Sequence, residues 1–300
     1  MTRDQTPVTT AYLEQLSATD LDLLAGFDGR LSQLRDRQEF VDALSGSLDR
    51  LLSSPKVFES IFLSSEESDP FLAASPFFVF SVAVHRATAQ LETMTYVPEW
   101  LGLSRRAPVF DVVELREFVA SPWRRLFLAE LLASYTHVTS GSVMVPTRRG
   151  LRRQRFSELD PVRLAALLEL VSPAERPGVL RRLGDLSLFL TGVFPDYVAR
   201  RGFGPIDEGR LLRAGGAEGD RSRQRGVVDF GDRGAVGLLE QLGRRWYRGA
   251  FQSLPRPVSE NVAVIGELPE RFDQARRMLG FVTEQFVFPH RDRWFGIAGG

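Results

Sequence analysis

The stretch FFVFSVAVHRATAQLETM, residues 77–94, is the most informative part of the sequence for the fold. Its first half is apolar on every face of a helix, which is typical of a helix inside a protein rather than on its surface. Pro76 precedes it and Pro98 follows it. The uncharged run is shorter than the roughly 20 continuous apolar residues of a membrane-spanning helix. We therefore predict a buried helix over 76–96 and no membrane span.

Working outward from this helix, apolar residues recur at helical spacing over most of the chain. The segments with this spacing are 35–52, 109–120, 122–137, 160–171, 173–201, 234–251 and 267–288. Only residues 142–156 alternate instead, around a turn at Thr147–Gly150, which favours a hairpin. The sequence predicts an all-α protein, a multi-helix bundle-like body with one short β-hairpin near 142–156.

Composition also suggests how the chain is divided. Residues 1–10 are polar and are expected to fray, and 11–201 should form the main helical body with its hairpin. Residues 202–226 hold seven of the 26 glycines together with several arginines, which predicts a flexible loop. Residues 227–300 should supply C-terminal helices that pack on the main body.

Charge and cysteine content restrict the function. The 38 basic and 38 acidic residues cancel, so no overall field attracts the chain to nucleic acid or to an anionic membrane. Cysteine is absent, which excludes disulfides, thiolate catalysis and cysteine-based metal sites. No apolar leader follows Met1, so we expect the protein in the cytoplasm. Nucleotide-binding, zinc-protease and hydrolase motifs are missing from the sequence, and no cofactor is expected.

Two helices carry histidine and glutamate at matching intervals. His85 and Glu92 are seven residues apart on one, and Glu130 and His137 on the other, so each pair shares a helix face about 10 Å apart. Opposed across a bundle, the four would be ligands for a metal ion. The favoured alternative is a partly buried His85 bonded to a neighbour, with the other three on solvated faces, because the Glu-x-x-His spacing of di-iron bundles is absent.

A carboxylate lies in an apolar stretch further along the chain. In LGDLSLFLTGVFP, residues 183–195, Leu188 and Phe189 flank Asp185 on a helical wheel. A buried carboxylate needs donors or a raised pKa. We interpret Asp185 as a structural buried carboxylate paired with a group from another helix, in preference to a catalytic acid.

The same stretch carries a resemblance. Its GD-x-x-LF-x-x-G-x-FP pattern, followed by Arg245-Trp246-Tyr247 and a closing helix that ends near Trp294, resembles uncharacterised helical proteins of high-GC bacteria. The similarity covers about 120 residues of the C-terminal half. It implies a helical fold and brings no known activity.

Arginines gather at the tip of the predicted hairpin. Five positive charges fall within eight residues, at Arg148, Arg149, Arg152, Arg153 and Arg155. A projecting basic hairpin would bind an anionic partner through phosphate contacts. The favoured alternative is a solvent-facing loop that the arginine-rich composition of the chain has filled, since 37 arginines accompany a single lysine.

These observations favour a non-catalytic cytoplasmic interaction or regulatory protein, with a protein as partner. Two alternatives stay open: a metal-dependent helical-bundle enzyme that uses His85, Glu92, Glu130 and His137, and a nucleic-acid binder that uses the arginine-rich hairpin. Whether the protein is an enzyme is left open, with the balance of motifs against catalysis. A nucleic-acid partner is not favoured, because the net charge is zero.

Overall fold

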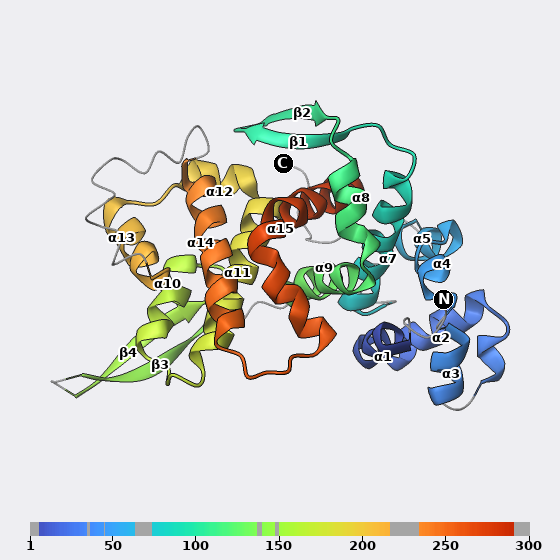
Figure 1. Cartoon of the computed structure of the whole chain (residues 1–300), viewed down its shortest axis with the longest axis horizontal. Coiled ribbons are helices and arrows are strands. Elements are labelled where there is room, and N and C mark those ends of the chain that lie inside the picture. The colour runs from blue at the N-terminus through green and yellow to red at the C-terminus, as the bar shows by residue number, and fades with distance from the viewer. Residues whose placement is uncertain are drawn as a thin grey trace. The chain divides into compact units, whose positions relative to one another are not determined.

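The structure is a computed structural model that describes residues 6–34, 37–44, 46–63, 74–136, 140–147, 150–216 and 234–290 (Figure 1). Helices dominate these residues, and the predicted hairpin is present at 140–157, so the predicted all-α class with a short hairpin is confirmed. Within the described part of the chain, no helix has the length and hydrophobicity that crossing a membrane requires.

The chain divides into two compact units. The first comprises residues 1–97, 109–136 and 281–300, and the second comprises 98–108 and 137–280. The expected boundaries at 201 and 226 both fall inside the second unit, because helices on either side of them pack against each other there.

The first unit is built around α7 (Pro76–Leu91), the helix that the opening stretch predicts. Eleven of its residues are buried, and α9 (Pro122–Ser134) packs along it. The remaining elements of this unit are α1 (Thr6–Gln15), α2 (Ala18–Phe27), η1 (Leu31–Gln33), α3 (Arg37–Leu44), α4 (Leu48–Leu52), α5 (Pro55–Phe62), α8 (Val113–Ala120), a π-helical turn η5 (Thr283–Val287) and η6 (Phe288–His290).

The expectation of a frayed segment over residues 1–10 is wrong from Thr6 onward, where α1 begins. Val8 and Tyr12 lie four residues apart on one face of α1 and are both buried. Their tertiary packing stabilises a helix whose polar sequence gives little amphipathic signal. The prediction also ended α7 too late, since the helix stops at Leu91 and a strand begins at Val97.

The second unit is built around α11 (Arg176–Val193) and α14 (Gly234–Gln252), which lie side by side in Figure 1. The other elements that lie in this unit, entirely or for all but their end residues, are β1 (Val97–Gly102), β2 (Arg105–Val109), β3 (Ser140–Thr147), β4 (Gly150–Ser157), α10 (Pro161–Ala165), η2 (Ala166–Glu169), α12 (Pro195–Arg201), α13 (Pro205–Ala214) and α15 (Glu260–Val282). The single helix predicted over 173–201 is broken at Phe194, before Pro195.

Glycines allow α11 and its neighbours to approach closely. A Cβ atom placed on Gly184 of α11 would lie 2.8 Å from Cδ1 of the Tyr247 ring on α14. On α14, a Cβ atom on Gly243 would lie 2.6 Å from Phe272 of α15 and 2.9 Å from Cβ of Ser187. Real Cβ atoms do not approach so closely without a shift in the packing, so only glycine fits these two positions as they stand.

The two hairpins differ in how visible they are in the sequence. β3 and β4 pair in the antiparallel register that sets Thr147 opposite Gly150, as the alternation predicts. The β1–β2 sheet was not predicted, because 142–156 was expected to be the only β element. The helix expected over 109–120 begins only at Val113. Its strands contain Pro98 and Pro108 and show no clean alternation, so side-chain contacts with helices stabilise them instead.

The loop expected over 202–226 is partly wrong. α13 fills residues 205–214, with Pro205 in its first turn, two acidic residues beside it and a fully buried Leu211. Trp246 of α14 donates from Nε1 to the carbonyl oxygen of Ala214 at 3.2 Å and so satisfies the helix end. The rest of the segment, 217–226, lies outside the described residues.

The close approach of α11 and α14 can be tested with two glycines of the same helix. Gly184→Ala should lower the free energy of unfolding by about 1–3 kcal/mol, because the new methyl group overpacks against the Tyr247 ring. Gly178→Ala should be neutral or stabilising by up to about 1 kcal/mol, because no atom lies within 4 Å of its Cβ position. Urea denaturation of both variants is the measurement, and equal effects would contradict the role of Gly184.

Candidate functional site

His85 lies at the centre of a polar chain inside the first unit. Its Nε2 atom is 2.9 Å from the Tyr12 hydroxyl of α1, and its Nδ1 atom is 3.4 Å from Oδ1 of Asp49 in α4. Asp49 in turn accepts two bonds from one guanidinium nitrogen of Arg125, at 2.9 and 2.8 Å. Arg125 also donates to the carbonyl oxygen of Val119 at 2.6 Å. The chain ties α1, α4 and α9 to α7.

The protonation state of His85 follows from its surroundings. Burial, and after it the positive charge of Arg125, lower the pKa of His85 to about 3, so the ring is neutral. We assign its proton to Nδ1, because the Asp49 carboxylate can only accept, and Nε2 then accepts from the Tyr12 hydroxyl. Burial raises the pKa of Tyr12 against the opposing charge of Arg125. Both ring nitrogens therefore have protein partners.

Of the four residues of the alternative metal site, the structure describes His85, Glu92 and Glu130, and it does not group these three. Glu92 is exposed at the C-terminal end of α7, and Glu130 is half-buried on α9, where its charge acts on Tyr12. His137 lies outside the described residues. Among the residues that are described, no three histidine, aspartate or glutamate side chains are grouped to hold a metal ion. The bonds that His85 makes match the alternative interpretation, a buried histidine bonded to its neighbours.

Asp185 is buried on α11, as its apolar neighbours suggested. Tyr247 of α14 donates its hydroxyl to Oδ1 at 2.8 Å, and Nε of Arg181, one turn earlier in α11, is 3.8 Å from Oδ2. Burial raises the pKa of Asp185, against the lowering effects of Arg181 and of the bond from Tyr247. The partner from another helix is thus a tyrosine, while the arginine comes from the same helix.

The arginine-rich hairpin is described only in its backbone. Arg152, Arg153 and Arg155 stand on β4 opposite Val145, Met144 and Ser142 of β3. The side chains of these three arginines, and Arg148 and Arg149 altogether, lie outside what the structure describes. Binding of an anionic partner at this hairpin stays a prediction.

The β1–β2 hairpin of the second unit is a second candidate for a binding site. The β1–β2 hairpin is fastened to α12 by Asp196, whose Oδ1 accepts from Nε1 of Trp100 at 2.8 Å and from the backbone N–H of Ser104 at 2.7 Å. Burial acts to raise the pKa of Asp196, but these bonds and the nearby Arg106 outweigh it and lower the pKa. The carboxylate therefore stays ionised and keeps accepting both bonds.

A second contact fastens the same strand to α15. Glu99 forms a largely buried ion pair with Arg277, and burial raises the pKa of Glu99 against the charge of Arg277. Neighbouring residues of a strand point to opposite faces, so Glu99 and Trp100 attach β1 to two different helices. Both attachments are made inside the second unit, and they position the hairpin tip.

Large apolar side chains are exposed beside these attachments. Leu101 and Leu103 of the hairpin are 48% and 51% exposed, and Phe194 and Tyr197 next to Asp196 are 36% and 51% exposed. Because Trp100 and Ser104 both contact Asp196, the segments that carry these two pairs meet at Asp196. Four arginines occur in the same two segments. We call this the hairpin surface: Leu101, Leu103, Phe194, Tyr197, Arg105, Arg106, Arg200 and Arg201.

The hairpin surface has more arginines than carboxylates, although Arg106 pairs with Asp196 at 3.5 Å and Arg201 with Asp160 at 3.4 Å. Within 97–109 and 194–201 the carboxylates are the inward-facing Glu99 and Asp196. Arg105 has no carboxylate partner in the described part of the chain, and Arg200 donates only to the hydroxyl of Ser104, at 3.2 Å. Sequence analysis missed this surface, although the neighbouring aromatic and proline of 194–197 already broke a helix that was expected to continue.

Comparisons of the chain with family models, with curated proteins and with solved structures find no match. The resemblance of residues 184–195 to helical proteins of high-GC bacteria is therefore still a prediction. The roles argued for the sites above therefore depend on the contacts and distances in this structure.

The buried, neutral His85 predicts a pH dependence of stability. The folded pKa lies below the unfolded value, so the unfolded chain binds one more proton once the pH falls below about 6.5. The stability due to this group is complete above that pH and should fall by about 2 kcal/mol between pH 6.5 and pH 5. Urea denaturation over this pH range should show the slope in the wild type and its loss in His85→Gln. His137→Gln and His290→Gln are the controls, and an unchanged slope in His85→Gln would contradict the burial of a neutral ring.

Asp185 gives a prediction with the opposite sign. Its folded pKa is raised, so its ionisation opposes folding, and wild type should lose stability relative to Asp185→Asn as the pH rises from about 4 to 7. Asp207→Asn, the same change at a half-exposed residue of the same unit, is the control. Tyr247→Phe should cost about 1–3 kcal/mol, because it leaves a buried acceptor without its donor. If the wild type instead became more stable relative to Asp185→Asn as the pH rises, the raised pKa of Asp185 would be wrong.

Proposed function

We propose that this protein is a non-catalytic interaction protein that acts in the cytoplasm and binds a protein partner through the hairpin surface. The observation that carries the proposal is the exposure of four large apolar side chains, Leu101, Leu103, Phe194 and Tyr197, around one fastened hairpin. Single exposed apolar residues are ordinary, whereas a group of them bordered by polar residues marks an interaction site.

The attachments of the hairpin support this proposal. Binding costs the entropy of ordering the side chains and loops at an interface, so a surface that is already fixed binds more tightly for the same contacts. Trp100 and Glu99 fix the strand to α12 and α15 before any partner arrives. Tyr197 is likewise held by Arg201, which donates to its hydroxyl at 2.8 Å.

Charge indicates the chemistry of the partner. Aromatic residues and arginine are the residue types that interfaces favour, and the hairpin surface supplies both. Of its four arginines, Arg106 pairs with Asp196 and Arg201 with Asp160. Arg105 and Arg200 have no carboxylate partner among the described residues. The complementary partner is an acidic segment with an apolar face, which would place leucine or aromatic side chains against Leu101 and Leu103 and carboxylates against Arg105 and Arg200.

The experiment begins with a photo-crosslinking amino acid in place of Leu103, in cells in which the gene occurs naturally. Mass spectrometry then identifies the crosslinked protein and the peptide at the contact, which should be acidic. With the purified partner, Leu101→Asp and Leu103→Asp should each weaken binding at least tenfold, about 1.4 kcal/mol, without changing the melting temperature, because both side chains are exposed.

The matched control is Ile206→Asp, the same kind of change at a 73% exposed residue of α13 outside the hairpin surface. Arg105→Glu should slow association and reduce its salt dependence, as expected for an arginine at the border of an interface. Equal affinities for Leu103→Asp and Ile206→Asp would refute the proposal.

A further inference from the structure

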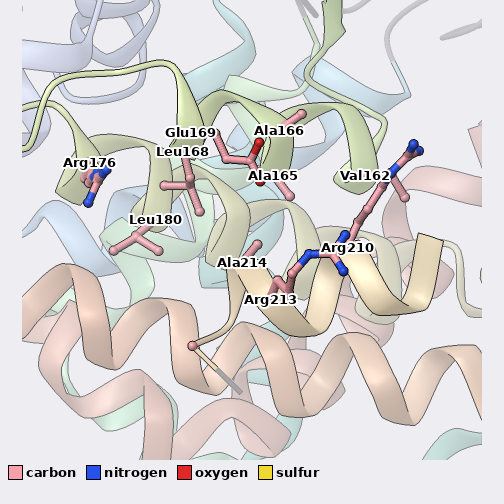
Figure 2. A pocket seen from close by; sticks show the side chains of 11 residues that line it. Val162, Ala165, Ala166, Leu168, Glu169, Arg176, Leu180, Arg210, Arg213 and Ala214 are labelled. Atoms are coloured by element: carbon pink, nitrogen blue, oxygen red, sulfur yellow. The ribbon is translucent and has the colours of Figure 1, made fainter. Parts of the chain in front are cut away.

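A cavity of about 510 Å³ lies in the second unit, and no residue of the hairpin surface lines it. That volume is within the range of small-molecule sites, about 300–1,000 Å³. Figure 2 shows its lining, with α13 on one side and α10, η2 and the first turns of α11 on the other. The lining residues are Val162, Ala165, Ala166, Leu168, Glu169, Arg176, Leu180, Arg210, Arg213, Ala214 and Gly216.

One part of this lining is apolar. Ala165, Ala166, Leu168 and Leu180 come from three consecutive elements and supply methyl and methylene groups without a hydrogen-bonding atom. Leu168 and Leu180 are only half-buried, so each keeps contact area that no other described side chain covers. A hydrocarbon body bound here would remove this area from water, at about 25 cal/mol for each Å².

The charged part of the lining is predominantly positive. Three arginines stand against Glu169 alone. Arg210 pairs with Asp207 at 3.2 Å, an exposed contact of little strength. The guanidinium groups of Arg176 and Arg213 have no hydrogen-bond or ion-pair partner within the described part of the chain. In the view of Figure 2, Arg176 and Arg213 stand on opposite sides of the lining, with Leu168 and Leu180 between them. The planar guanidinium group of an arginine presents donors that match the oxygens of a carboxylate or a phosphate.

We infer that this cavity binds a small amphiphilic anion, with an apolar chain or ring against Leu168 and Leu180 and an anionic oxygen headgroup held by Arg213. Carboxylate and phosphate headgroups share this chemistry. The site shares no lining residue with the hairpin surface, so it would give the proposed interaction protein a ligand site in addition to its protein partner.

Isothermal titration calorimetry on the full chain tests the inference with decanoate and decyl phosphate, both below their micelle-forming concentrations. At least one should bind saturably at one site per chain, and the tighter of the two identifies the headgroup. Decanol and decyltrimethylammonium carry the same tail without a negative charge and should bind at least tenfold more weakly. Inorganic phosphate, which has the charge without a tail, should also bind more weakly.

Matched variants locate the site. Arg213→Gln should weaken binding about tenfold by removing a charge-assisted contact, whereas Arg248→Gln, an exposed arginine of the same unit outside the cavity, should leave it unchanged. Ala166→Phe should weaken binding by filling the cavity, and its melting temperature shows whether it still folds. Absence of saturable binding by both anions, equal binding of decanol, or equal affinities of Arg213→Gln and Arg248→Gln would each overturn the inference.

Discussion

The contact between Tyr247 and the Gly184–Asp185 pair is the interaction on which the second unit depends. The ring lies so close to Gly184 that a methyl group there would clash, and its hydroxyl bonds to Asp185 in the same turn. One tyrosine thus sets both the distance and the register between α11 and α14. The neighbouring Trp246 closes the end of α13, and Gly192, two turns further along α11, lets Leu279 of α15 approach. Residues 184–192 of α11 and the Trp246–Tyr247 pair of α14 thus fix how α11, α13, α14 and α15 pack.

In the first unit, polar groups rather than glycines fix how the helices pack against each other. Its central helix is apolar enough to pack in several registers, because Phe, Val and Ala occur on every face of its first half. The chain from Tyr12 through His85 and Asp49 to Arg125 requires one arrangement, since each group has a partner only in that register. A buried polar group without its partner is costly, so such a chain selects one packing more sharply than it stabilises the fold.

A structural feature can be predicted from the sequence when the residues that cause it lie close together along the chain. The helix at 76–91 and the hairpin at 140–157 follow from spacing and turn residues within a few positions, and both could be predicted. The burial of Asp185 also followed from its neighbours, but its partner Tyr247 is 62 residues away and could not. The β1–β2 hairpin depends on Asp196 and Arg277, which lie 96 and 178 residues from the strand residues that they contact. Neither spacing nor composition carries such information, and the candidate surface was missed for that reason.

The hairpin surface has a physical property that favours a binding role over chance exposure. A partly buried hydrogen bond from Trp100 and a largely buried ion pair of Glu99 hold the two-stranded hairpin in place. An isolated two-stranded hairpin would be marginally stable. Trp100 is itself buried and Glu99 neutralises the buried Arg277, so these attachments also belong to the core of the second unit. They hold the segment that carries Leu101 and Leu103 in a fixed place. If exposure of these side chains served no purpose, a free hairpin with polar residues would be more soluble and equally compatible with the fold. The rigid presentation of apolar side chains is what a pre-organised protein interface requires.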